Sequence, residues 1–161
     1  MFVLQALESG NYSAFGAAIL TDGVSRLFQF DAYFDVASTP VCFTAVGKFN
    51  LVAQPTRNDF LLEVRPFDDT GVSFTFRDQW IPQVAGTGSW IKDSYLLLGK
   101  CKRTFATVCC HVEPKENQIV EVKSLVQFPD GRRTAVQFTV APHDPQTAMG
   151  NIISLHRRKR A

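Results

Sequence analysis

The sequence predicts an all-β protein, an antiparallel up-and-down meander of about nine strands that forms a closed or nearly closed barrel. Apolar and polar residues alternate with a period of two through most of the chain, as in half-buried antiparallel strands, and no long segment repeats at 3.6 residues. Short turns join the alternating segments, so consecutive strands are expected to pair, and closing the sheet removes its exposed edges. A two-sheet β-sandwich is the alternative architecture.

The 161 residues fit a single domain built around this barrel. Residues 1–12 are expected to form an N-terminal arm or a short helix, and residues 13–141 the barrel. The C-terminal segment, residues 142–161, is expected to contain a short helix over Thr147–Leu155 before a basic tail.

The first hairpin has the clearest signal. Residues Val24–Val36 alternate without interruption and predict one long strand. Asp22-Gly23 before it is typical of a two-residue hairpin turn, which would place Ala17 opposite Phe28. This register puts the odd-numbered apolar residues of the preceding strand on the inner face: Phe15, Ala17 and Ile19.

Further alternating segments predict the rest of the barrel. A long irregular connection with two glycines and a proline is expected over residues 78–90. In the last hairpin, a two-residue Asp130-Gly131 turn would place the charged Lys123 opposite Phe138 on the apolar face. A three-residue loop over 130–132 avoids this pairing and is therefore expected, with Val126 opposite Val136. The other strands are expected within residues 41–51, 60–65, 72–77, 94–98, 106–112, 120–128 and 136–140.

Phenylalanine is unusually frequent, with 14 copies against 2 Trp and 3 Tyr. A buried Phe contributes a large area and has no polar atom to satisfy, so a Phe-rich inner face predicts a thick core or the wall of an apolar cavity. Arg26 interrupts the apolar face near a strand end, where it could hold a carboxylate or phosphate at the barrel mouth. The expected ligand-binding residues are Arg26, Phe28, Phe30, Phe34, Phe43, Phe49, Phe74, Phe76, Trp80 and Trp90.

The sequence contains no recognisable catalytic or metal-binding motif. Cys109, His111 and Glu113 share one face of a strand, but successive side chains on such a face are about 7 Å apart, too far for a direct hydrogen bond. Cys110 points the other way, which argues against a shared metal. No catalytic residue and no metal site are therefore assigned. Gly88-Ser89-Trp90 resembles the G-x-W signature of lipocalins, but too little chain follows it for a full barrel, so only a lipocalin-like architecture is expected.

Positive charge is concentrated at the C-terminus. The net charge is +2, and omitting Arg157, Arg158, Lys159 and Arg160 leaves 13 basic against 15 acidic residues, or −2. A near-neutral body argues against a broad surface for duplex DNA, whereas the tail is typical of a nuclear-localisation or nucleic-acid-binding cluster. Four cysteines fit free thiols in a reducing compartment, and no signal peptide or membrane span is evident. The expected location is the cytoplasm, or the nucleus in a eukaryote.

These observations favour a non-enzymatic binding module that holds a small apolar ligand inside the barrel, without a cofactor. The second hypothesis is a self-associating protein, for example a homodimer, because Leu27, Tyr33, Leu61 and Leu125 fall on the polar faces. The third is a single-stranded nucleic-acid binder that uses Phe stacking and the basic tail, although nucleic acid is the less expected partner. The fourth is a barrel enzyme without a recognisable motif.

Overall fold

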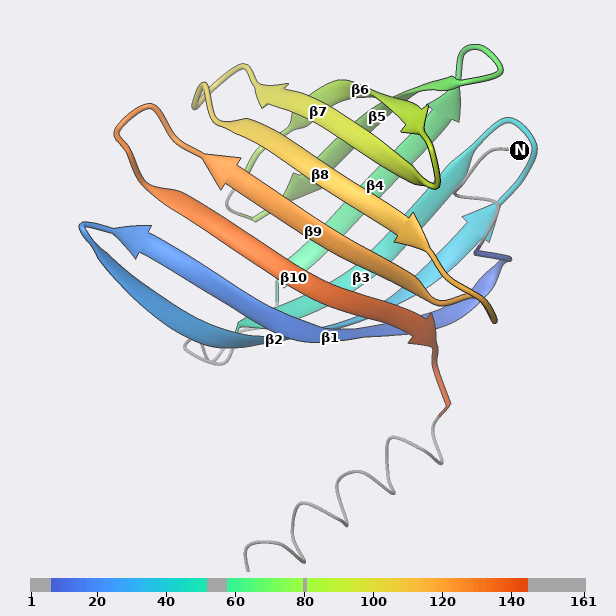
Figure 1. Cartoon of the computed structure of the whole chain (residues 1–161), viewed down its shortest axis with the longest axis horizontal. Coiled ribbons are helices and arrows are strands. Elements are labelled where there is room, and N and C mark those ends of the chain that lie inside the picture. The colour runs from blue at the N-terminus through green and yellow to red at the C-terminus, as the bar shows by residue number, and fades with distance from the viewer. Residues whose placement is uncertain (1–6, 52–57, 80, 145–161) are drawn as a thin grey trace, which may run out of the picture.

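The computed structural model describes residues 7–51, 58–79 and 81–144, and the regular elements within these ranges are all β-strands (Figure 1). They are β1 (Gly10–Asp22), β2 (Val24–Ser38), β3 (Phe43–Leu51), β4 (Asn58–Pro66), β5 (Gly71–Asp78), β6 (Val84–Ile91), β7 (Ser94–Cys101), β8 (Thr107–Pro114), β9 (Val120–Gln127) and β10 (Arg133–Pro142). Each strand pairs antiparallel with its neighbours in sequence, and β1 closes the ring against β10. The predicted all-β closed meander is confirmed, with ten strands rather than about nine.

The two ends of the chain are only partly described. Strand β1 begins at Gly10, so residues 10–12 belong to the barrel rather than to an arm or helix. The helix expected over Thr147–Leu155 and the basic tail lie outside the described residues. Within the described ranges, no helix is long and apolar enough to cross a membrane.

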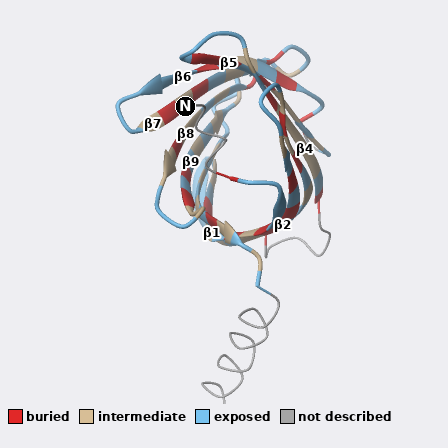
Figure 2. Ribbon diagram, turned by 90° about the vertical axis from the view of Figure 1, so that its right-hand side faces the viewer, coloured by how far each residue is buried: buried red, intermediate tan, exposed pale blue. Residues whose placement is uncertain are grey.

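Strand β2 illustrates how the alternating sequence builds the wall. Ala32, Phe34 and Val36 are buried, whereas Tyr33 and Asp35 between them are exposed. Figure 2 shows buried and exposed positions interleaved in this way along the strands. Because successive side chains of a strand point to opposite faces, the apolar set gathers in the interior.

The register of the first hairpin differs from the predicted one by one residue. Ala18, rather than Ala17, lies opposite Phe28. A one-residue shift turns every side chain of a strand to the other face, so Phe15 and Ile19 are exposed and the even-numbered residues of β1 face inward. The predicted inner face of this strand is therefore wrong.

Close packing of the backbone shows why a glycine lies on this inner face of β1. A Cβ atom at Gly16 would overlap the carbonyl oxygen of Gln137 and would lie 2.6 Å from the Cα of Phe138 on β10. Glycine at this inward position therefore lets β1 and β10 approach each other. Ala14 and Ala18 on either side are fully buried, and this small inner face leaves room for the large side chains of other strands.

The segment predicted as a long connection contains strand β6, so only residues 79–83 link β5 to β6. A Cβ atom at Gly86 would overlap the carbonyl oxygen of Leu98, and one at Gly88 would overlap the side chain of Leu97, both on β7. The two glycines permit close contact between strands instead of marking a loop. The prediction missed β6 because these two roles of glycine look alike in a sequence.

The loop of the last hairpin is displaced by one residue from the predicted position. The Phe128 N–H donates to the Arg132 carbonyl at 2.8 Å, so the three loop residues are Pro129, Asp130 and Gly131. Gly131 has a positive φ of 91°, as expected for the last position of a three-residue loop. Val136 consequently lies opposite Ser124 and not Val126.

Among the residues that the structure describes, the two ends of the barrel carry opposite net charge. The Gly23 end contains the turns after β1, β5, β7 and β9, and the Leu7 end contains the N-terminal segment and the turns after β2, β4, β6 and β8. In the described loops and the three residues at each strand end, the Gly23 end has seven basic and four acidic residues, a net +3: Arg26, Arg77, Lys100, Lys102, Arg103, Arg132, Arg133, Asp22, Asp59, Asp78 and Asp130. The Leu7 end has three basic and eight acidic residues, a net −5: Arg65, Lys92, Lys115, Glu8, Asp68, Asp69, Asp93, Glu113, Glu116, Glu121 and Asp144.

Candidate functional site

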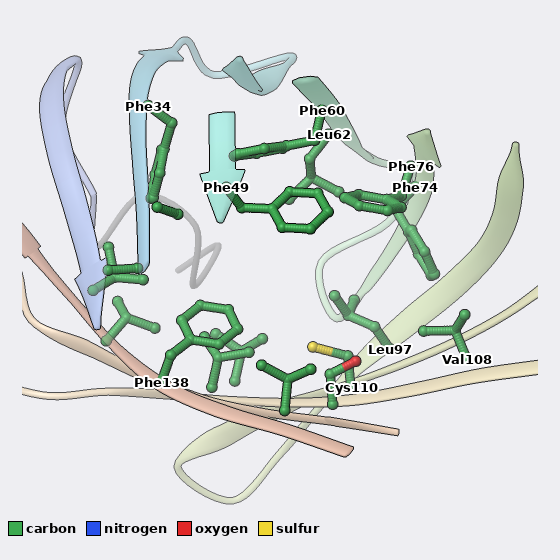
Figure 3. Close-up of a pocket in the computed structure, with 18 of the residues that line it drawn as sticks. Phe34, Phe49, Phe60, Leu62, Phe74, Phe76, Leu97, Val108, Cys110 and Phe138 are labelled. Carbon is green, nitrogen blue, oxygen red and sulfur yellow. The ribbon is translucent and has the colours of Figure 1, made fainter. Parts of the chain in front are cut away.

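The interior of the barrel contains an apolar pocket of about 290 Å³. All ten strands contribute to its lining of 24 residues, and the side chains project from two opposing walls toward a shared space (Figure 3). In this lining only the Ser124 hydroxyl and the Cys110 thiol bring a polar side-chain atom. The site is therefore suited to contact with an uncharged, apolar surface.

One wall of the pocket is aromatic. It is formed by strands β2 to β5, which supply seven of the eight lining phenylalanines: Phe30, Phe34, Phe43, Phe49, Phe60, Phe74 and Phe76. The Phe34 and Phe60 rings pack edge to face with centroids 5.7 Å apart, and the Phe60 and Phe76 rings are stacked with centroids 6.2 Å apart. Such pairs stabilise each other beyond the area they bury, so this wall is a cohesive surface.

The opposite wall is mainly aliphatic. Strands β7 to β10 supply it: Leu97, Val108, Cys110, Val112, Val120, Val122, Ser124, Val126, Val136, Phe138 and Val140. Phe138 bridges to the aromatic wall, because its ring centroid lies 5.0 Å from that of Phe30. A bound molecule would lie between rings on one side and branched side chains on the other.

The Cys110 thiol points into the pocket (Figure 3) and has an unusual protonation equilibrium. Burial raises its pKa from 9.0 to about 12, the charge of a Cys109 thiolate adds to the rise, and a hydrogen bond with Ser124 opposes it. A thiolate is the reactive form of cysteine, and at neutral pH Cys110 stays protonated. Its chemistry is that of a small apolar side chain.

Each end of the pocket is lined by a buried side chain from outside the strands. At the Leu7 end, Leu7 is buried, and the neighbouring Tyr12 hydroxyl lies 2.8 Å from the Glu8 carbonyl oxygen and 2.6 Å from Gln118 Oε1. At the Gly23 end, Ile81 is held by a hydrogen bond of 2.6 Å from its N–H to Asp78 Oδ1. Both side chains line the pocket, so they contribute apolar surface at its two ends.

The structure places most of the predicted ligand-binding residues together. Six of them line the pocket: Phe30, Phe34, Phe43, Phe49, Phe74 and Phe76. Phe28 is half-buried and Arg26 is exposed near the Gly23 end, and neither lines the pocket. Trp90 is exposed and packs against Tyr95 with ring centroids 5.2 Å apart. Trp80 lies outside the described residues.

Several lining residues were not predicted as ligand contacts. Phe60, Leu62 and Phe138 lie on strands whose alternation was recognised, so the same signal that identified the other phenylalanines could have found them. The aliphatic wall offered no such signal, because valines on an inner face look the same whether they pack together or border a pocket.

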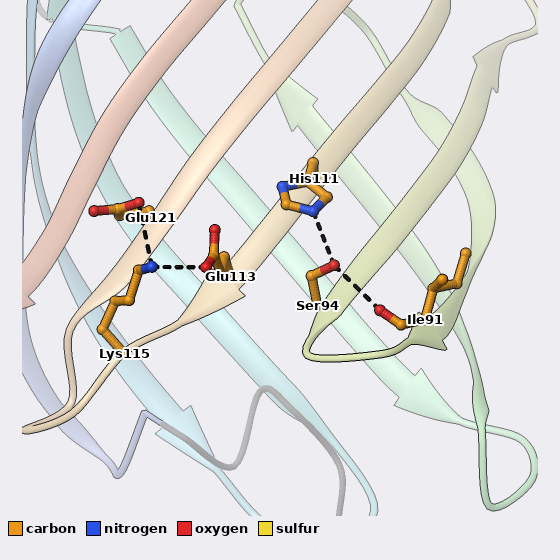
Figure 4. Close-up of polar contacts among 6 residues, drawn as sticks. All are labelled: Ile91, Ser94, His111, Glu113, Lys115 and Glu121. Carbon is orange, nitrogen blue, oxygen red and sulfur yellow. Dashed lines mark hydrogen bonds and ion pairs between the residues drawn. The ribbon is translucent and has the colours of Figure 1, made fainter.

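The polar residues considered for catalysis lie on the outer wall (Figure 4). His111 Nε2 lies 2.8 Å from the Ser94 hydroxyl, which donates in turn to the Ile91 carbonyl at 3.3 Å. Lys115 donates to Glu113 at 2.6 Å and thereby lowers the pKa of that carboxyl group. These contacts tie strands and turns together outside the pocket. In the described part of the chain, no three His, Cys, Asp or Glu residues gather closely enough to hold a metal ion.

Comparison with known proteins reveals similarity in fold but no match to a family model or a curated sequence. No protein-family model matches the chain, and no curated protein sequence matches it. Among solved structures, the chain is similar to an S-type phycobiliprotein lyase from Guillardia theta, with a TM-score of 0.63 and 9% sequence identity over 88% of this chain and 91% of that one. The likeness shows the fold, a closed antiparallel barrel.

Proposed function

We propose that this protein is a non-enzymatic binding module that holds one small, uncharged, apolar ligand inside its barrel. The observation that carries the proposal is the interior pocket, whose 24 lining residues include no charged side chain. A barrel that packed its interior completely would leave no such space, since protein interiors normally contain few voids larger than a water molecule. The likeness to a phycobiliprotein lyase supports a ligand-holding barrel at the level of the fold.

The size of the pocket indicates the size of the ligand. Its volume of about 290 Å³ lies just below the usual range for ligand pockets, which is roughly 300–1,000 Å³. An engineered apolar cavity of about 150 Å³ binds benzene and stays free of water. A ligand of two or three hydrocarbon rings, or a branched chain of similar bulk, is therefore the appropriate class.

The lining also indicates the charge of the ligand. An ionised carboxylate or sulfonate inside the pocket would lose its hydration, at a cost of several kcal/mol, and would find only the Ser124 hydroxyl and the Cys110 thiol as donors. The ligand is therefore neutral, at least in the part that enters the barrel.

Two dyes that share their ring system test this proposal. N-Phenyl-1-naphthylamine is neutral, whereas 8-anilinonaphthalene-1-sulfonate has the same rings and an added sulfonate. The neutral dye should bind with a stoichiometry of one per chain and with fluorescence enhancement, and the sulfonate should bind at least about tenfold more weakly. Equal affinity for both dyes, or no saturable binding of the neutral one, would contradict the proposal.

A further inference from the structure

The pocket is packed more loosely toward one end of the barrel than toward the other. At the Leu7 end its lining is buried, and Phe43 and Val120 have exposed fractions of only 2% and 3%. At the Gly23 end, Ile81 is buried on the side of β5 and β6, whereas Val126 on β9 and Val136 on β10 are half-buried. The turns after β1, β7 and β9 lie at this end, on the left of Figure 1. Because inward side chains of β9 and β10 keep accessible surface, this is the side from which a ligand can reach the pocket.

Beyond the pocket lining, the inner wall continues into a region that we call the mouth and that consists of Leu20, Arg26, Phe28 and Thr134. Leu20 on β1 lies opposite Arg26 on β2 and opposite Thr134 on β10. The three uncharged residues of the mouth are half-buried, and Arg26 is exposed. Arg26, Phe28 and Phe30 alternate on one face of β2, and Phe30 lines the pocket. Neighbours on one face of a strand are about 7 Å apart, so the Cα of Arg26 lies about 13 Å from that of Phe30, with an apolar ring between them.

The charges of the Gly23 end are suited to an anion. Its described residues carry a net charge of +3, and three of the four acidic side chains among them are already engaged. Asp59 and Asp130 form ion pairs at 3.5 and 2.7 Å, and Asp78 accepts a backbone N–H. Six basic residues of this end form no ion pair with any residue that the structure describes: Arg26, Arg77, Lys100, Lys102, Arg103 and Arg133. Of those that lie on strands, Arg26 is the one that alternates in step with pocket-lining residues.

We propose that the ligand is an amphiphile whose apolar body fills the pocket and whose carboxylate, carried on a short chain, lies at the mouth against Arg26. This inference rests on the proposed function and adds the part of the ligand that stays outside the pocket. A guanidinium donates two parallel hydrogen bonds to a carboxylate, and at the exposed mouth both groups keep part of their hydration. The chain is required because a charge attached directly to the rings would be carried into the apolar lining. The sulfonate of 8-anilinonaphthalene-1-sulfonate is such a charge, since it lies beside the nitrogen that joins the two ring systems.

Two competitors with the same rings and the same chain test this inference. 4-(1-Naphthyl)butanoate ends in a carboxylate, whereas 4-(1-naphthyl)butan-1-ol ends in a neutral hydroxyl group. Each is titrated into the full chain loaded with N-phenyl-1-naphthylamine, and the loss of dye fluorescence gives its affinity. The carboxylate should bind at least about threefold more tightly than the alcohol at low salt. This preference should shrink as the salt concentration is raised, because exposed charge pairs are screened.

Two arginine variants assign the preference to a residue. Arg26→Gln should reduce the affinity for the carboxylate to that for the alcohol. Arg133→Gln is the matched control, because Arg133 is an exposed arginine at the same end whose neighbour Thr134 takes the inward position, and it should keep the preference.

The outcomes separate this inference from the proposed function. A wild-type chain that binds the dye but shows no preference for the carboxylate overturns the inference and leaves the proposed function intact. A preference that survives Arg26→Gln, or that is lost equally in Arg133→Gln, also overturns it. A chain that does not bind the dye at all contradicts the proposed function itself, and the inference fails with it.

Discussion

Replacement of Ser124 by Phe is expected to abolish binding of the neutral dye while leaving the barrel folded. Ser124 lies on the aliphatic wall, directly opposite Val136 on one neighbouring strand and Cys110 on the other. A benzyl group at this position projects into the pocket and occupies the volume that a ligand would take. The affinity for N-phenyl-1-naphthylamine should fall at least about tenfold in a fluorescence titration.

Two companion variants separate the loss of space from other effects. Ser124→Ala removes the hydroxyl without filling the pocket and should retain the affinity for the dye. Gln127→Phe adds the same benzyl group to an exposed position of the same strand and should bind as the wild type does. Undiminished binding by a folded Ser124→Phe protein would place the dye outside the barrel.

Replacement of Gly16 by Ala is expected to destabilise the protein by about 3 kcal/mol, at the upper end of the usual cost of overpacking. The added Cβ would overlap the Gln137 carbonyl oxygen, and backbone atoms cannot move aside as the end of a flexible side chain can. The two strands that close the barrel, β1 and β10, would have to separate at this point. The free energy of unfolding from urea titration measures the effect.

Gly10→Ala is the matched control on the same strand. The Cβ atom at Gly10 would have only Tyr12 Cε2 nearby, at 3.9 Å, so no atom needs to move. Alanine also restricts the unfolded chain more than glycine does, and this variant should be neutral or more stable by roughly 0.5 kcal/mol. Equal effects of the two substitutions would show that close approach of β1 and β10 does not depend on Gly16.

The fold could be predicted because alternation is a local property of the sequence. Val24–Val36 needed no partner to be recognised as a strand, and closure followed from the succession of hairpins. Pairing register was less accessible, because it depends on contacts between strands. Gly16 and Gly86 look like interruptions in the sequence, but each lies where a neighbouring backbone leaves no room for a Cβ atom.

The site could be predicted in part for the same reason. Phe34 and Phe76 were identified because large apolar residues on an inner face are conspicuous, and both line the pocket. Arg26 alternates in step with the inward-facing residues of β2, but it lies near the end of the strand, where its side chain reaches solvent. The volume left between the two walls depends on the sizes of all inward-facing side chains, including small ones such as Ala14. No single sequence motif reveals that total.

A crystal of the protein soaked with iodobenzene would test the central claim most directly. Iodobenzene is neutral and small enough for a pocket of about 290 Å³, and the anomalous scattering of iodine reports its position without interpretation of weak density. The proposal predicts an iodine site inside the barrel, between the rings of Phe49 and Phe60 and the wall that contains Cys110 and Ser124. A soaked crystal with iodine only on the outer surface of the barrel, and with close-packed side chains in the interior, would contradict a ligand-binding barrel.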